Sequence, residues 1–159
     1  METLNILLND LESKIASKDS INPLGSTSDV SWHIAHSLKV VAQVVETIKM
    51  SNPQEYRWKF NHTRSFVYLF NYFPRGKGKA PKAVVPTDAQ TSEQLREDLQ
   101  TVRLMLLELE HLDAKSNFMH PYFGQLNLKQ TKKFLALHTK HHLKIMNDIV
   151  KGQHGLTKQ

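Results

Sequence analysis

The segment FLALHTKHHLKI, residues 134–145, carries three histidines within what is otherwise the pattern of an apolar helix face. Burying imidazole rings costs free energy unless their nitrogens find partners. His138 and His142 are four residues apart, so on a helix they lie on one face, with His141 on the flank. This is the spacing by which a helix offers two imidazoles to one metal ion. The alternative is a set of rings hydrogen-bonded to carbonyl groups or carboxylates, or placed at the wet end of a bundle.

A second pair of histidines occurs in the segment SDVSWHIAHSL, where His33 and His36 are three residues apart. His33 lies beside the apolar stripe of the helix expected there, whereas His36 is turned further outward. We therefore predict that His33 completes a three-histidine metal site with His138 and His142. His36 is assigned to the edge of the site, in substrate binding.

Three neutral imidazoles leave a bound ion its full positive charge, so it can polarise a carbonyl or lower the pKa of a water or thiol. Imidazole titrates near neutral pH, which makes His141 or His120 the expected general base. His120 is followed by a proline, so its backbone is extended and its ring could point back over the helices. A surface position for His120 is the alternative.

A long loop, residues 74–90, is rich in proline, glycine and basic residues. Its basic residues are Arg75, Lys77, Lys79 and Lys82. Arg75 is assigned to substrate binding, because it could hold an anionic part of a substrate. The alternative is a solvated, flexible connection.

Amphipathic helices must position these residues, since apolar side chains recur at helical spacing along most of the chain. The expected helices span residues 2–18, 28–50, 60–72, 92–112 and 128–150, of which the aromatic-rich 60–72 is either one helix or a broken one. The expected core stripes contain Leu4, Leu7, Leu8, Leu11 and Ile15; Val30, Ile34, Leu38, Val41, Val45 and Ile48; Leu95, Leu99, Val102, Leu106 and Leu109; and Phe134, His138, Ile145 and Ile149. Candidate N-caps are Ser26, Thr27, Ser28 and Asn127, with Thr91 and Gln94 in a capping-box pattern. Four main helices without a clear strand pair predict an all-α four-helix bundle with a long crossover loop.

The composition is that of a globular protein with one core. The chain has 159 residues, 40% of them hydrophobic, which predicts a single domain over residues 1–151 and a frayed tail over 152–159. There is no cysteine, which excludes disulfides, thiolate ligands and cysteine nucleophiles. No signal peptide and no apolar stretch of about 20 residues is found, so no membrane association and a cytoplasmic location are expected.

The order of these motifs resembles the DinB/YfiT-like superfamily of four-helix-bundle metalloproteins. WHIAH and HxxHH carry the resemblance, and PRGKGKAPK and HPYFGQL are similar to segments of an uncharacterised DinB-related branch. The resemblance implies a divalent ion, zinc or nickel, on His33, His138 and His142. It also implies a metal-dependent hydrolase or thiol S-transferase acting on a small molecule. The chain departs from the relatives at Ile145, where they often have a glutamine.

Two other functions remain open at this point. The first is a non-catalytic helical bundle that binds a metal or small ligand, which the Ile145 departure favours slightly. The second is nucleic-acid binding, suggested by the formal net charge of +6. The basic residues are scattered and lack interleaved aromatic residues to stack on bases, so a nucleic-acid partner is not expected. A homodimer could form through the aromatic-rich segment 56–73.

Overall fold

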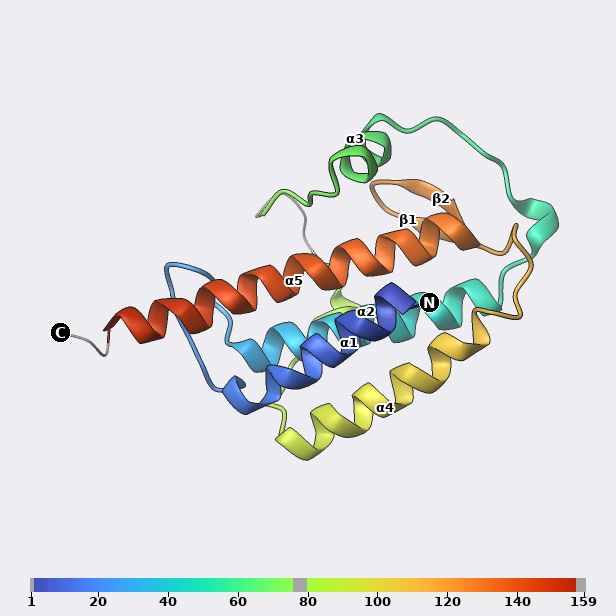
Figure 1. Ribbon diagram of the computed structural model, residues 1–159. Helices are drawn as coiled ribbons and strands as arrows, with labels where there is room; N and C mark the ends of the chain where they lie inside the picture. The colour runs from blue at the N-terminus through green and yellow to red at the C-terminus, as the bar shows by residue number, and fades with distance from the viewer. Residues whose placement is uncertain (1, 76–79, 157–159) are drawn as a thin grey trace.

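The computed structural model describes residues 2–75 and 80–156. Within these ranges the chain forms five α-helices, three short 3-10 helices and one antiparallel pair of strands (Figure 1). In chain order they are α1 (Glu2–Ser13), η1 (Ile15–Ser17), α2 (Val30–Lys49), η2 (Pro53–Glu55), α3 (His62–Phe70), η3 (Lys82–Val84), α4 (Ser92–Glu108), β1 (Asn117–His120), β2 (Gly124–Asn127) and α5 (Leu128–Leu156). The expected all-α four-helix bundle is therefore wrong, because it lacks both the strand pair and a place for a fifth helix.

The hydrophobic core lies between the four longest helices. Helix α2 packs against α4 and α5, and α1 packs against the same two helices. Every apolar residue of the four predicted stripes is buried, whereas His138, on the last of them, is half-buried. Helical periodicity therefore identified the core correctly, although it did not give the complete fold.

Helix α3 and the β1–β2 hairpin lie together at one end of α5 (Figure 1). The buried guanidinium of Arg64, on α3, donates hydrogen bonds to the carbonyl groups of Phe123 and Gln125, on and next to β2. Gly124 opens β2 with a φ of 69°, a conformation that glycine adopts without strain. The sequence showed no clear strand pair, because two strands of four residues are too short for a distinct alternation of apolar and polar residues. Contacts such as those of Arg64 stabilise it instead.

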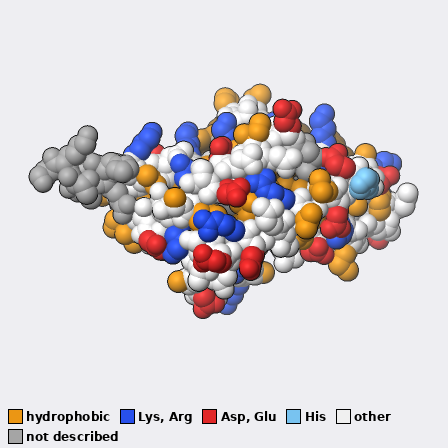
Figure 2. Space-filling model, turned by 60° about the horizontal axis from the view of Figure 1, so that its bottom comes forward, with side chains coloured by type: hydrophobic (Ala, Val, Ile, Leu, Met, Phe, Trp, Pro, Cys, Tyr) orange, Lys and Arg blue, Asp and Glu red, His pale blue; other side chains and the backbone are white. Residues whose placement is uncertain are grey.

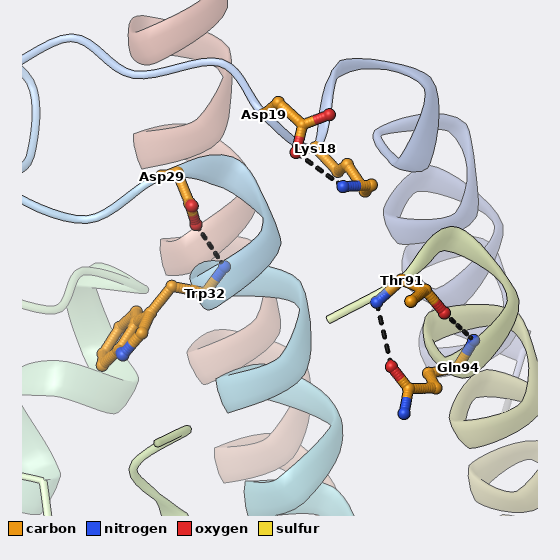
Figure 3. A network of polar contacts seen from close by, with 6 residues as sticks. All are labelled: Lys18, Asp19, Asp29, Trp32, Thr91 and Gln94. Atoms are coloured by element: carbon orange, nitrogen blue, oxygen red, sulfur yellow. Dashed lines mark hydrogen bonds and ion pairs between the residues drawn. The ribbon is translucent and has the colours of Figure 1, made fainter. Parts of the chain in front are cut away.

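Polar side chains cap the N-termini of α2, α4 and α5. The carboxylate of Asp29 accepts a hydrogen bond from Trp32 N at 2.7 Å and is the N-cap of α2 (Figure 3). The expected N-caps at residues 26–28 are therefore wrong. The capping box of Thr91 and Gln94 is confirmed (Figure 3). Asn127 also caps α5, because its side-chain oxygen accepts from the amide of Gln130 at 2.9 Å.

The connection from α3 to α4 returns along α2. Its 3-10 helix η3 packs against α2, so this part of the predicted loop 74–90 is ordered by a tertiary contact. Lys77 and Lys79 lie outside the described residues. Helix α5 continues to Leu156, so the tail expected to fray from residue 152 begins as helix, and residues 157–159 lie outside the described part.

Two surface features bear on the expected partners. Among the helices described, none is both long enough and apolar enough to cross a bilayer. On the face shown in Figure 2, Lys and Arg side chains are interspersed with Asp and Glu. That face therefore carries no continuous basic surface.

Candidate metal centre

Helices α2 and α5 pack side by side and bring three histidines together. His36 comes from α2, and His138 and His142 come from successive turns of α5. One ring nitrogen from each residue can be chosen so that all three atoms lie within 4.8 Å of one another. Among the described residues, this group alone has the spacing of a metal site made of histidine, cysteine or carboxylate ligands.

The ring of His36 is fixed by contacts on two sides. Its Nδ1–H donates to the carbonyl oxygen of Val84, in η3, at 2.8 Å. The indole of Trp32 stacks on it, with 4.9 Å between ring centroids. Because the hydrogen bond holds the proton on Nδ1, the lone pair of Nε2 is available to bind an ion. Ligating histidines in metalloproteins are oriented by such hydrogen bonds.

His33 contacts the cluster without belonging to it. Its Nδ1 lies 3.0 Å from Nδ1 of His142, and its Nε2 lies 2.9 Å from Oγ of Ser26. Both nitrogens of His33 are thus engaged in hydrogen bonds. If His142 donates through Nδ1–H and His33 donates through Nε2–H, then Nε2 of His142 keeps a free lone pair. His33 is therefore placed to orient His142, whereas the sequence had suggested it as a ligand.

His138 differs from the other two histidines because its ring has no hydrogen-bond partner among the described residues. Its Nδ1 is fully buried and unpaired. A buried polar atom without a partner costs about 1–3 kcal/mol. A metal ion or a ligand bound at this ring would remove that cost.

Burial keeps the imidazoles of this region neutral. It lowers the pKa of His33 to about 4 and also lowers the pKa of His36. The pKa values of His138 and His142 are held well below 6.5, first by burial and then by the neighbouring histidines. Neutral imidazole is the form that binds metal ions, so the cluster is ready for an ion at neutral pH.

The three histidines form one wall of a cavity of about 440 Å³ between α2, α5, β1 and the segment that precedes α4. Apolar and aromatic side chains make up most of its lining. They include Trp32, Val40, Val44, Phe73, Phe118 and Phe134. A ligand in this cavity would be next to the ring nitrogens of the cluster.

His141 and His120, the predicted general bases, both line this cavity. The ring of His141 is hydrogen-bonded to the backbone of Phe73, and burial is the main cause of its lowered pKa. Its second ring nitrogen remains available to accept a proton. His120 differs, because its Nδ1 accepts hydrogen bonds from the amides of Tyr122 and Phe123 at 3.1 and 3.2 Å. Neutral His120 therefore carries its proton on Nε2, an arrangement that favours a hydrogen-bond donor over a base.

Arg75, predicted to bind substrate, lies in a neighbouring pocket that shares Phe73 and His141 with the main cavity. Its guanidinium forms an ion pair with Asp148 at 2.6 Å. Lys140 and Lys144 also line this second pocket. Arg75 is thus close to the cluster but does not line its cavity.

Sequence periodicity indicated all four histidines closest to this centre, but it placed His33 among the three expected ligands and His36 outside them. His36 was assigned to the edge because it is turned away from the central stripe of α2. It is nevertheless buried, since η3 and Trp32 cover it. No local pattern signals that contact, because Val84 is 48 residues away in the sequence.

Comparison with known proteins places the chain in a family without assigning an activity. Searches of curated proteins and of solved structures returned no match. A family model described as a protein of unknown function, DUF1569, matches residues 2–148. That description does not include the DinB/YfiT-like superfamily, so the resemblance to it stays a prediction. Because the match covers most of the chain, the protein belongs to the DUF1569 family.

Proposed function

We propose that the protein binds a divalent metal ion, zinc or nickel, through His36, His138 and His142. The observation that carries this proposal is the approach of three ring nitrogens to within 4.8 Å of one another beside a cavity. Hydrogen bonds on Nδ1 of His36 and of His142 support it, because they leave Nε2 of each ring for an ion.

The residues present fit such an ion with a small adjustment. Zinc–nitrogen bonds of about 2.0–2.1 Å in tetrahedral geometry place the ligand nitrogens about 3.3 Å apart. The rings therefore need to draw together by at most about 1.5 Å from their positions here. Movement of the His138 ring would break no hydrogen bond, because its Nδ1 has no partner. Imidazole ligands suit zinc and nickel, and copper or iron as well.

The reaction class we propose is hydrolysis of a small molecule or transfer of a small thiol to an electrophile. A divalent ion with three neutral ligands supplies a positive charge that activates water or a thiol near neutral pH. His141 takes up the released proton at the nitrogen that Phe73 leaves free. His120 donates a hydrogen bond from Nε2 to the substrate. The aromatic wall excludes bulk water and orients the substrate.

A second candidate is a bundle that binds a metal or a small ligand without turning it over. Two observations favour it. Ile145, one turn beyond the cluster, is buried in the core, so no polar group is available there. The contacts of His120 also leave His141 as the remaining candidate base. The expectation that nucleic acid is not a partner and the possible homodimer both stay predictions.

Metal content tests the proposal directly. The protein is purified, its tag is cleaved off, and bound metal is measured by mass spectrometry before and after loading with zinc or nickel. We expect close to one ion per chain in the wild type and loss of that ion in His138→Ala. The control His111→Ala, at an exposed position near the end of α4, should keep the ion. Absence of metal from the loaded wild type would refute the proposal. Turnover of thiol and ester substrates by the loaded protein would separate the enzyme from the binding protein.

A further inference from the structure

The side chains that line the cavity beside the histidine cluster indicate the charge of the ligand it could bind. Among the described residues that line it there is no Asp, Glu, Lys or Arg. The polar side-chain groups among these residues are the histidine rings, the amide of Gln43, the hydroxyl of Tyr122 and the indole N–H of Trp32. Charged side chains line the second pocket instead, where Lys140 and Lys144 accompany the ion pair of Arg75 and Asp148. A charged ligand in the main cavity would lose its hydration without gaining an ion pair.

The walls are aromatic and held in place. His120 stacks on Phe123 at 4.3 Å between ring centroids and meets the edge of Phe134 at 4.7 Å. On the other side Phe73 contacts Phe134 and His138, at 6.2 and 6.3 Å between centroids. Ring faces and edges fixed in this way favour offset stacking and edge-to-face contact with an aromatic or other apolar ligand.

The size of the cavity sets the size of the ligand. Its volume of about 440 Å³ falls in the range of small-molecule sites. An engineered apolar cavity of about 150 Å³ binds benzene. The cavity here therefore has room for more than one ring.

We propose that this cavity binds an uncharged, largely apolar small molecule with an aromatic body. The body contacts Trp32, Phe73 and Phe134. A single oxygen, nitrogen or sulfur atom of the ligand is turned toward His36, His138 and His142. This last point rests on the proposed metal site, whereas recognition of the apolar body needs no ion.

Two fluorescent probes with the same skeleton test the proposal. N-phenyl-1-naphthylamine is neutral, and 8-anilino-1-naphthalenesulfonate adds one negative charge. Each is titrated into the metal-free and the zinc-loaded protein, and the increase in fluorescence is measured. We expect the neutral probe to bind the metal-free protein at least about tenfold more tightly than the sulfonate, because no Lys or Arg is present in the described lining of the cavity to pair with the charge. Binding without metal would support the cavity even if the metal proposal failed.

Matched variants locate the bound probe. Phe73→Ala removes part of the cavity wall and should weaken binding of the neutral probe by about tenfold. Phe70→Ala changes an exposed ring on α3, outside the cavity, and should leave binding unchanged. Ala83→Trp adds bulk at an exposed position on the cavity lining and should also weaken binding. Thermal unfolding followed by circular dichroism shows whether each variant is folded. If Phe73→Ala is unfolded, Ala83→Trp alone tests whether the probe binds in the cavity.

Three results would overturn the proposal. The first is equal or tighter binding of the sulfonate, lost in Lys140→Ala, which would assign the ligand to the basic second pocket. The second is loss of binding in Phe70→Ala but not in Ala83→Trp, which would place the probe on α3. The third is no binding of the neutral probe at all.

Discussion

Replacing His33 and His36 one at a time distinguishes a ligand from a residue that orients a ligand. Both lie on α2, one turn apart, and both are buried. His36 belongs to the group of three close ring nitrogens, whereas His33 is hydrogen-bonded to His142 and to Ser26. The same substitution at these two positions should therefore have different effects on metal affinity.

The expected magnitudes follow from these contacts. A structural zinc site with four ligands is worth about 10–16 kcal/mol, so one ligand contributes about 3 kcal/mol, or on the order of a hundredfold in affinity. We expect at least this loss in His36→Ala. Loss of a partner that orients a ligand costs about 10–100-fold, which we expect for His33→Ala. Asparagine separates the two roles further, because its side-chain oxygen can accept the hydrogen bond from Nδ1–H of His142. We expect His33→Asn to recover most of the affinity and His36→Asn to recover none.

The assay is a competition titration of zinc between the tag-free protein and a chromogenic chelator at pH 7.5. Unfolding of the metal-free variants in urea is measured alongside, so that a loss of fold is not mistaken for a loss of ligand. His111→Ala serves as a control at an exposed position. Abolished binding in both His33 variants together with near wild-type affinity in His36→Ala would refute this reasoning. It would show that His33 is the ligand from α2, as the sequence had suggested.

Three further predictions concern the stability of the metal-free protein, measured by urea unfolding. Burial lowers the pKa of His120 from 6.5 to about 4. The unfolded chain therefore binds a proton that the folded chain does not between those pH values, and stability falls as the pH drops. Asparagine at this position keeps a hydrogen-bond acceptor but does not titrate. Between pH 7 and pH 5 the unfolding free energy of His120→Asn should therefore fall by about 2 kcal/mol less than that of the wild type. The control His111→Gln should show the same fall as the wild type. Asp29→Ala removes the N-cap of α2 and should cost about 1 kcal/mol, whereas Asp19→Ala breaks an exposed ion pair and should cost less than about 0.5 kcal/mol. Arg64→Leu takes the donor from three main-chain carbonyl groups and should cost about 3 kcal/mol; a cost below 1 kcal/mol would contradict its role in holding α3 on the hairpin.

The local spacing of apolar residues was sufficient to predict the long helices and the faces that they bury. Leu8, Val41 and Leu99 are fully buried, as the helical spacing of apolar residues predicts. Such spacing is informative because one face of a helix in a small domain must leave water. The pairing of His138 with His142 has the same origin, since i and i+4 always share a helix face.

Which histidine of α2 lies closest to that pair depends on the tertiary structure, because the segment between α3 and α4 packs against α2. On a helical wheel His36 faces outward. In the structure η3 covers its ring, and the carbonyl oxygen of Val84, 48 residues away in the sequence, accepts the hydrogen bond from its Nδ1–H. The hairpin also depends on a long-range contact, because Arg64 and the start of β2 meet only after the chain folds. The sequence by itself determined the helices, their core faces and the histidine pair on α5, all of which depend on neighbours within a few residues. The third histidine, the cavity beside it and the strand pair depend on contacts between distant segments, which periodicity does not encode.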